Sequence, residues 1–132
     1  MLVKISGSSE PGTKDFKLKL NIPFIYLDKE DYTISVRRMS FKCVKDPGAV
    51  FFSLHTSAVD RSLVNPDQEI ALVYNRGSSY IYSHPPTPLI YKVQIKEIHT
   101  ADFKLRTSAA ITENKIENFV AIIEILRDVR IQ

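Results

Sequence analysis

The amino-acid sequence predicts an all-β protein, an antiparallel β-sandwich or barrel-like fold of about eight to ten short strands. Apolar and polar residues alternate along several stretches, as side chains do on a half-buried strand. Turn residues recur about every eight to twelve positions, and no stretch is a convincing long helix. The 132 residues, 44% of them apolar and 25% charged, fit one domain over residues 1–132, with residues 1–15 as an N-terminal strand and arm.

The first elements follow from apolar alternation that proline and polar turns interrupt. Leu2–Ile5 predicts a short strand, and residues 6–13, rich in serine and glycine, predict a loop. Apolar residues alternate with lysines over 16–22, and Pro23 ends this second strand because proline cannot donate to a sheet ladder. After a polar turn, alternation resumes over 32–41. One face of this third strand is predicted to hold Tyr32, Ile34, Val36, Met39 and Phe41.

The middle of the chain predicts a strand and a long connection. Lys45–Gly48 is a turn, because Pro47 presets the first corner and Gly48 accepts a positive φ. The strand that starts at Ala49 is apolar on both faces, which predicts burial on two sides or a crossing between sheets. Residues 56–68 are polar and interrupted by proline, which predicts a long connection with one short helical turn.

Two further strands, over residues 69–74 and 80–82, are predicted to pair as a hairpin around a turn at Gly77. A proline-rich connector over 84–88 follows. Alternation then predicts strands over 89–98 and 103–106.

The last segment, residues 116–131, carries two apolar patterns. Helical spacing joins Ile116, Phe119 and Ile123, whereas strand spacing joins Phe119, Ile123 and Ile125. The segment is rich in β-branched residues and no glycine or proline ends a helix within it, so the strand is favoured. The run ends in Val129–Gln132, which would be an unusually apolar free tail.

Charge and cysteine content predict a protein of a reducing compartment. The net charge of +3 arises from 18 basic residues interleaved with 15 acidic ones, which indicates a solvated mixed surface. The lone Cys43 excludes an intrachain disulfide. The first residues lack the pattern of a signal peptide, and no apolar run is long enough to span a membrane. We therefore expect neither secretion nor a membrane span.

No motif predicts catalysis, a metal or a cofactor. His55, His84 and His99 are isolated from other metal-ligating residues; His84 is expected in an exposed loop and the other two at strand edges. Cys43 is interpreted as a small, half-buried apolar residue and not as a nucleophile. Glycine-rich phosphate loops and hydrolase motifs are missing from the sequence. We therefore expect a protein that is not an enzyme and holds no cofactor.

Two groups of residues are candidates for interaction. Aromatic and basic residues that could stack bases or anchor a protein partner are Tyr74, Arg76, Tyr80, Tyr82 and Tyr91. Tyrosines at the edge of the core are the plainer interpretation, because strands favour tyrosine. A basic face of Lys17, Lys19, Arg37 and Arg38 would suggest weak contact with nucleic acid.

The opening of the chain resembles small β-rich structural proteins of eukaryotic DNA viruses and virus-derived elements. The resemblance covers residues 1–41 and, more faintly, the last strand. It rests on a short first strand, then Leu20-Asn21-Ile22-Pro23-Phe24-Ile25-Tyr26-Leu27-Asp28 and Tyr32-Thr33-Ile34-Ser35-Val36. It implies a jelly-roll-like sandwich that assembles into a capsid or decorates one. It also implies a location in the virion, or in the cytoplasm or nucleus of the host cell.

These observations lead to a functional expectation. We expect a structural, self-associating protein of a capsid or virion, with copies of itself or other structural proteins as partners, since exposed strand edges need cover. The alternative is a binding module of the same fold that grips a peptide, glycan or nucleic acid through its loops. An enzyme is the third class, and a concave pocket with converging titratable side chains would favour it.

Overall fold

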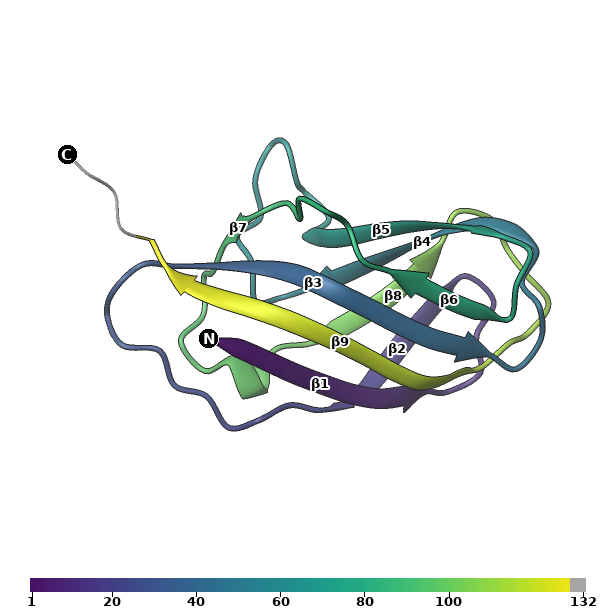
Figure 1. Ribbon diagram of the computed structural model, residues 1–132, viewed down its shortest axis with the longest axis horizontal. Helices are drawn as coiled ribbons and strands as arrows, with labels where there is room; N and C mark the ends of the chain where they lie inside the picture. Colours follow the sequence, from purple (N-terminus) through teal and green to yellow (C-terminus); the bar gives the residue numbers. More distant parts are fainter. Residues whose placement is uncertain (129–132) are drawn as a thin grey trace.

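The computed structural model describes residues 1–128, which form nine strands and one short 3-10 helix (Figure 1). All paired strands are antiparallel, so the predicted all-β antiparallel class is confirmed. The elements are β1 (Leu2–Ser9), β2 (Asp15–Asn21), β3 (Tyr32–Cys43), β4 (Ala49–Thr56), β5 (Glu69–Arg76), β6 (Tyr80–Ser83), β7 (Tyr91–Lys92), η1 (Ile98–Thr100), β8 (Phe103–Thr107) and β9 (Ile116–Arg127).

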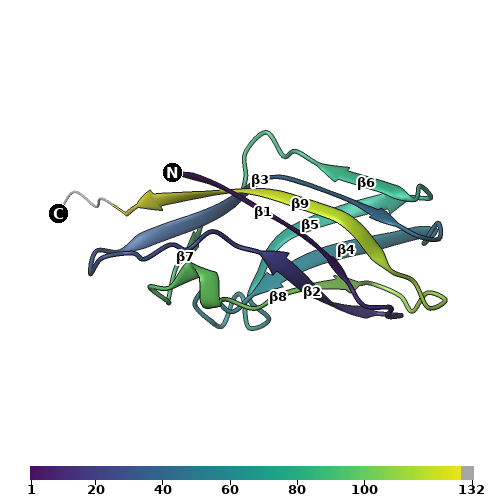
Figure 2. The same ribbon diagram turned by 90° about the horizontal axis from the view of Figure 1, so that it is seen from below.

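The strand order is β5-β4-β8-β2-β1-β9-β3-β6, with β7 also paired to β3. The first long strand therefore pairs with the last, the second with the next to last, and so on inward, which is the strand order of a jelly roll. The β6-β3-β9-β1 set faces the β5-β4-β8-β2 set across the core (Figure 2). Since β1 and β2 also pair, the sheet is nearly closed and opens only between its end strands, β5 and β6.

The core is built from the inward side chains of both sets. Phe41 of β3 lies at its centre, with its ring edge-on to Phe52 of β4 at 5.0 Å and stacked on Phe119 of β9 at 5.9 Å. All three rings are almost fully buried. Burying one such side chain contributes roughly 1.5–3 kcal/mol, so these rings join the two sets strongly.

A bulge explains the irregular apolar spacing of β3. Val36 pairs with Ile123 and Arg38 with Ile122, so Arg37 is one extra residue on this strand. Ile34 and Val36 before the bulge and Met39 and Phe41 after it are all buried. The predicted single apolar face is confirmed for these four residues, although they are not evenly spaced; Tyr32 is only half-buried.

Both ends of the described chain are strands. β9 confirms the strand predicted for the last segment through Arg127, and positions 129–131 lie outside the described residues. The loop predicted over residues 6–13 is wrong for its first half, because β1 continues to Ser9 and pairs with residues 18–21 of β2. Polar composition favoured a loop there, but Gly7 lets the two backbones approach closely, which a side chain would prevent.

Three further predictions in the middle of the chain are wrong. β5 pairs with β4 and β6 with β3, so the predicted hairpin is instead a crossing between the two sets, turned at Gly77 with φ of 111°. β4 is not buried on two sides, because Phe51 points outward and is 45% exposed, and it does not cross between sets, because both its neighbours, β5 and β8, belong to one set. Residues 57–68 contain turns but no helical turn.

The strand predicted over residues 89–98 is also wrong, because only Tyr91 and Lys92 pair, with β3. Val93 instead forms an isolated bridge with Val59, and η1 follows at Ile98. In this register the chain after Val93 runs past Tyr32, where β3 begins, so residues 94–98 have no β3 residue beside them. The alternating pattern therefore indicated which side chains are buried, but not that the backbone forms hydrogen bonds with a neighbouring strand.

Candidate functional site

Exposed apolar side chains gather on the connections at one end of the molecule. The β2–β3, β4–β5 and β6–β8 connections all lie at the end that appears on the left of Figure 1. We name this end of the molecule the loop end. Its large exposed apolar residues are Phe24, Tyr26, Leu63, Val64, Leu89 and Ile90. Within residues 1–128, the connections at the opposite end expose only Val44 in this class. Exposed apolar side chains that gather at one end of a molecule are candidates for an interaction site.

A reverse turn presents the most exposed part of the loop end. Ser62 and Asn65 exchange backbone hydrogen bonds, and the Asn65 amide accepts from the backbone N–H of Glu69 at 3.0 Å. Between them, Leu63 and Val64 point fully into solvent. These hydrogen bonds hold two apolar side chains at the tip of the connection.

An aromatic cluster forms a second part of this end. The ring of Phe24 stacks on His99 with centroids 4.1 Å apart, and Tyr26 lies edge-on to both rings at 4.8 and 5.3 Å. The backbone N–H of Ile25 donates to His99 Nδ1 at 3.3 Å. His99 was predicted at a strand edge, and the structure places it in η1. Phe24 remains 72% exposed, so the cluster offers an aromatic face to a partner.

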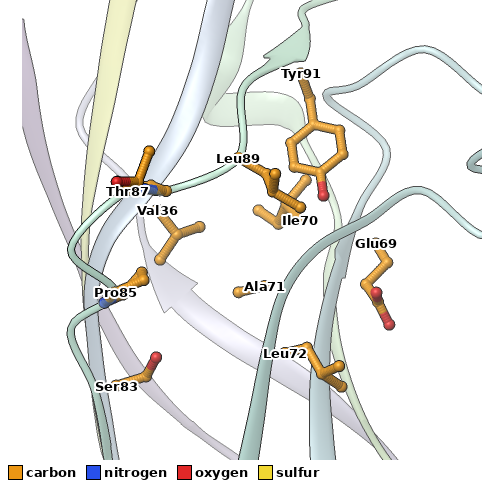
Figure 3. A pocket seen from close by; sticks show the side chains of 11 residues that line it. Val36, Glu69, Ile70, Ala71, Leu72, Ser83, Pro85, Thr87, Leu89 and Tyr91 are labelled. Carbon is orange, nitrogen blue, oxygen red and sulfur yellow. The ribbon is translucent and has the colours of Figure 1, made fainter.

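The open side of the sheet contains a small apolar groove, which we name the edge groove (Figure 3). It lies between β5 and residues 83–91, has a volume of about 230 Å³, and is lined by Val36, Ile70, Leu72, Leu89 and Tyr91 among others. Burial, followed by the nearby Glu69 carboxylate, raises the pKa of the Tyr91 hydroxyl. The groove is smaller than most cofactor sites and suits the side chains of an adjoining segment.

The structure distributes the predicted aromatic surface around this open side. Tyr74 and Arg76 lie on β5, where the Tyr74 ring packs against Phe51 at 4.8 Å. Tyr80 and Tyr82 lie on β6 in the other strand set, and both are exposed. Tyr91 is half-buried in the edge groove. The five residues therefore flank one opening without forming one continuous face.

The four predicted basic residues lie on two separate strands. Lys17 and Lys19 are on β2, Arg37 and Arg38 are on β3, and both β1 and β9 lie between these strands. Lys19 pairs with Glu10, and Arg37 lies 3.6 Å from Glu124. The structure does not bring the four charges together, and two of them are balanced by neighbours.

Two shallow hollows on the outer face of β4, β5 and β8 meet at His55. Its Nδ1 lies 2.7 Å from the Asp67 carbonyl oxygen, which can only accept, so Nδ1 carries the proton. Nε2 then accepts from the Ser53 hydroxyl at 2.8 Å. His55 lies one residue before the end of β4, and β4 itself is flanked by β5 and β8.

The hydrogen bond from Ser53 to His55 has the geometry that activates serine nucleophiles, a feature that sequence reasoning missed. The signal was a serine two residues before a histidine on one strand face. The same bonds also have a structural role, since they connect residue 67 of the long connection to β4. Among residues 1–128, no three histidine, cysteine or acidic side chains converge as a metal site would require.

Cys43 is more buried than predicted, with no exposed surface. Burial, with a smaller contribution from Asp46, raises the pKa of its thiol to about 12. The reactive thiolate is therefore scarce at neutral pH.

No protein-family model, curated protein or solved structure matches this chain. Within residues 1–128, no helix is long and apolar enough to cross a membrane.

Proposed function

We propose that this protein is a non-catalytic structural protein that self-associates as a component of a capsid or virion. Its proposed location is the virion, or the cytoplasm or nucleus of the host cell. The observation that carries the proposal is the concentration of apolar side chains at the loop end. The jelly-roll strand order agrees with the fold that the resemblance of residues 1–41 implies. Jelly rolls also occur in lectins and enzymes, so the fold supports the proposal only together with this surface.

Energetics favour covering the loop end with another protein surface. Full burial of one large apolar side chain is worth roughly 1.5–3 kcal/mol, and six such side chains share this end. Part of that gain offsets the loss of translational and rotational freedom on association. Apolar residues held on ordered turns lose little further freedom when a partner covers them.

Light scattering after gel filtration, with negative-stain microscopy of the same fractions, tests the proposal. We expect oligomers or particles for the natural chain, and association weakened at least about tenfold by Leu63→Ser combined with Val64→Ser. Val44→Ser is the matched control, since it removes an exposed apolar side chain from the opposite end. A natural chain that stays monomeric at every concentration would refute self-association.

The non-catalytic part of the proposal is tested at Ser53. A fluorophosphonate probe labels activated serines, and we expect it to leave both the natural chain and Ser53→Ala unlabelled. Labelling of the natural chain that Ser53→Ala abolishes would overturn this part, because the Ser53 hydroxyl bound to His55 would then be a nucleophile.

A second candidate function is a binding module that recognises a peptide, glycan or nucleic acid through its loops. The cluster of Phe24, Tyr26 and His99 favours it, because a preformed aromatic face stacks on sugars, bases or aromatic side chains. Titration of the labelled protein with oligosaccharides, oligonucleotides and peptides, followed by NMR, separates these ligands. A binding module would remain monomeric and shift the resonances of these three residues.

A further inference from the structure

The end strands of the sheet differ in how well they are protected from pairing. β6 has only four residues, whereas β5 has eight and contains neither lysine nor proline. A register irregularity between Leu54 and His55 affects the start of β5 and leaves residues 71–76 in regular register with β4. Natural proteins usually protect edge strands from further pairing by keeping them short, or by placing charged residues, proline or bulges in them. β5 is therefore an edge that a further strand can join.

The outward side chains of β5 are apolar at its centre and charged at its ends. Leu72 and Tyr74 are 55% and 48% exposed. Glu69 begins the strand and Arg76 ends it, and neither forms an ion pair within residues 1–128. Two unpaired charges of opposite sign thus flank an exposed apolar centre.

Antiparallel pairing of two identical copies satisfies this pattern. Around a two-fold axis, the beginning of one β5 lies beside the end of the other. Glu69 of each copy then approaches Arg76 of its partner, and the apolar centres meet on the same face. Parallel pairing would place like charges together at both ends.

From this complementarity we propose that two copies of the chain associate by antiparallel pairing of their β5 strands, joining two sheets across a two-fold axis. The proposal rests on the self-association proposed above and specifies one interface of it. The edge groove lies beside β5 and leaves room at residues 69–72 for side chains of the second copy (Figure 3).

Charge reversal tests this pairing. Because the test compares two variants with their mixture, its outcome does not depend on the folding stability of any one variant. Glu69→Arg places arginine opposite arginine at both ends, and Arg76→Glu places glutamate opposite glutamate. Each variant alone should weaken the two-copy complex at least about tenfold. Because the first variant carries only arginines and the second only glutamates at these ends, an equal mixture should restore the complex as a heterodimer.

Sedimentation equilibrium, with the two variants labelled by different dyes, provides the measurement. Glu113→Arg, an exposed charge reversal on the β8–β9 connection, should leave association unchanged. If the natural chain associates but the single reversals have no effect, or if their mixture stays dissociated, this interface is wrong while self-association stands. A monomeric natural chain would refute both.

Discussion

At the scale of single residues, the Cys43 thiol couples folding to pH. Its pKa is raised to about 12 in the fold, against an ordinary value of 9.0. The folded chain therefore holds this proton at pH values where the unfolded chain releases it, and stability is lost as pH rises through and above 9. By pH 10 we expect a loss on the order of 1 kcal/mol from this group.

Urea unfolding of the natural chain and of Cys43→Ala at pH 7 and pH 10 measures this contribution. The variant starts less stable because it leaves a cavity, so the comparison is between the two changes with pH. Both chains retain Tyr32 and Tyr91, whose raised pKa values act in the same direction. Equal changes in both chains would contradict the assignment to Cys43.

Residue types alone did not predict which side chains meet in the fold. Isolated histidines and a lone cysteine indicated no motif, yet the Ser53 and His55 bond depends on an outward strand face and on a carbonyl twelve residues away in sequence. The aromatic cluster joins Phe24 and His99, which only the tertiary fold brings together. Such contacts carry no local signal in one sequence.

At the scale of elements, Gly7 is required where β1 crosses close to β2. A Cβ built at this position would lie only 1.9 Å from the Lys19 carbonyl oxygen. Because that oxygen belongs to the backbone of a paired strand, it cannot move without breaking the ladder. We expect Gly7→Ala to destabilise the fold by about 3 kcal/mol or more in urea unfolding.

Gly48→Ala is the matched comparison for Gly7→Ala. It has open space around the added methyl group but a φ of 76°, so its cost is only that of a left-handed backbone, about 1 kcal/mol. Similar losses for the two variants would show that the approach of the two backbones is looser than described.

A bulge in β9 makes a second prediction at this scale. Asn118 has a φ of 53° and is an extra residue, since Ser40 pairs with Val120 and Lys42 with Glu117. Asparagine tolerates this conformation better than β-branched residues do. Asn118→Gly should therefore be more stable than Asn118→Val by at least about 1 kcal/mol.

Thermal or urea unfolding measures the stabilities of these two variants. The comparison is with position 120, where the natural valine and the variant Val120→Gly give the same pair of residues. There the strand is regular, so glycine should be less stable than the natural valine. A valine that is tolerated equally at both positions would mean that the bulge relaxes at little cost.

Alternation located most strands but not their lengths. It predicted the apolar positions of β2, β8 and β9, where one face of the strand is buried. It stopped β1 too early, because serine and glycine in Ser6–Ser9 favour loops when they are read without a neighbouring strand. It also overextended the strand around Tyr91, since the pattern reports burial and not pairing.

At the scale of the whole molecule, the fold class could be predicted but the pairing could not. The short turn at Gly77 predicted a hairpin, yet it carries the chain from one strand set to the other. Partner choice depends on the inward pairing from both ends of the chain, which a local window cannot detect. The loop end was missed for the same reason, because three distant connections form it.

Association at the loop end and at β5 should respond differently to salt. Sulfate favours burial of Leu63 and Val64 because it is excluded from the protein surface, whereas the attraction between Glu69 and Arg76 is screened by salt. We therefore expect high sodium sulfate to weaken the β5 complex relative to contacts at the loop end. Sedimentation at low and high sodium sulfate measures this difference. An identical response of the single charge variants and the natural chain would contradict this separation.

The N-terminal amine of Met1 donates to the Ile125 carbonyl oxygen at 3.0 Å, and β1 pairs with β9 along most of its length. During synthesis on the ribosome, residues 6–9 of β1 can pair with β2 early, but its other edge has no partner until β9 emerges. Until then, β1 and β3 each lack the strand that joins them into one set, because β9 lies between them. We infer that nascent chains of this protein depend on chaperones until translation of β9 is complete.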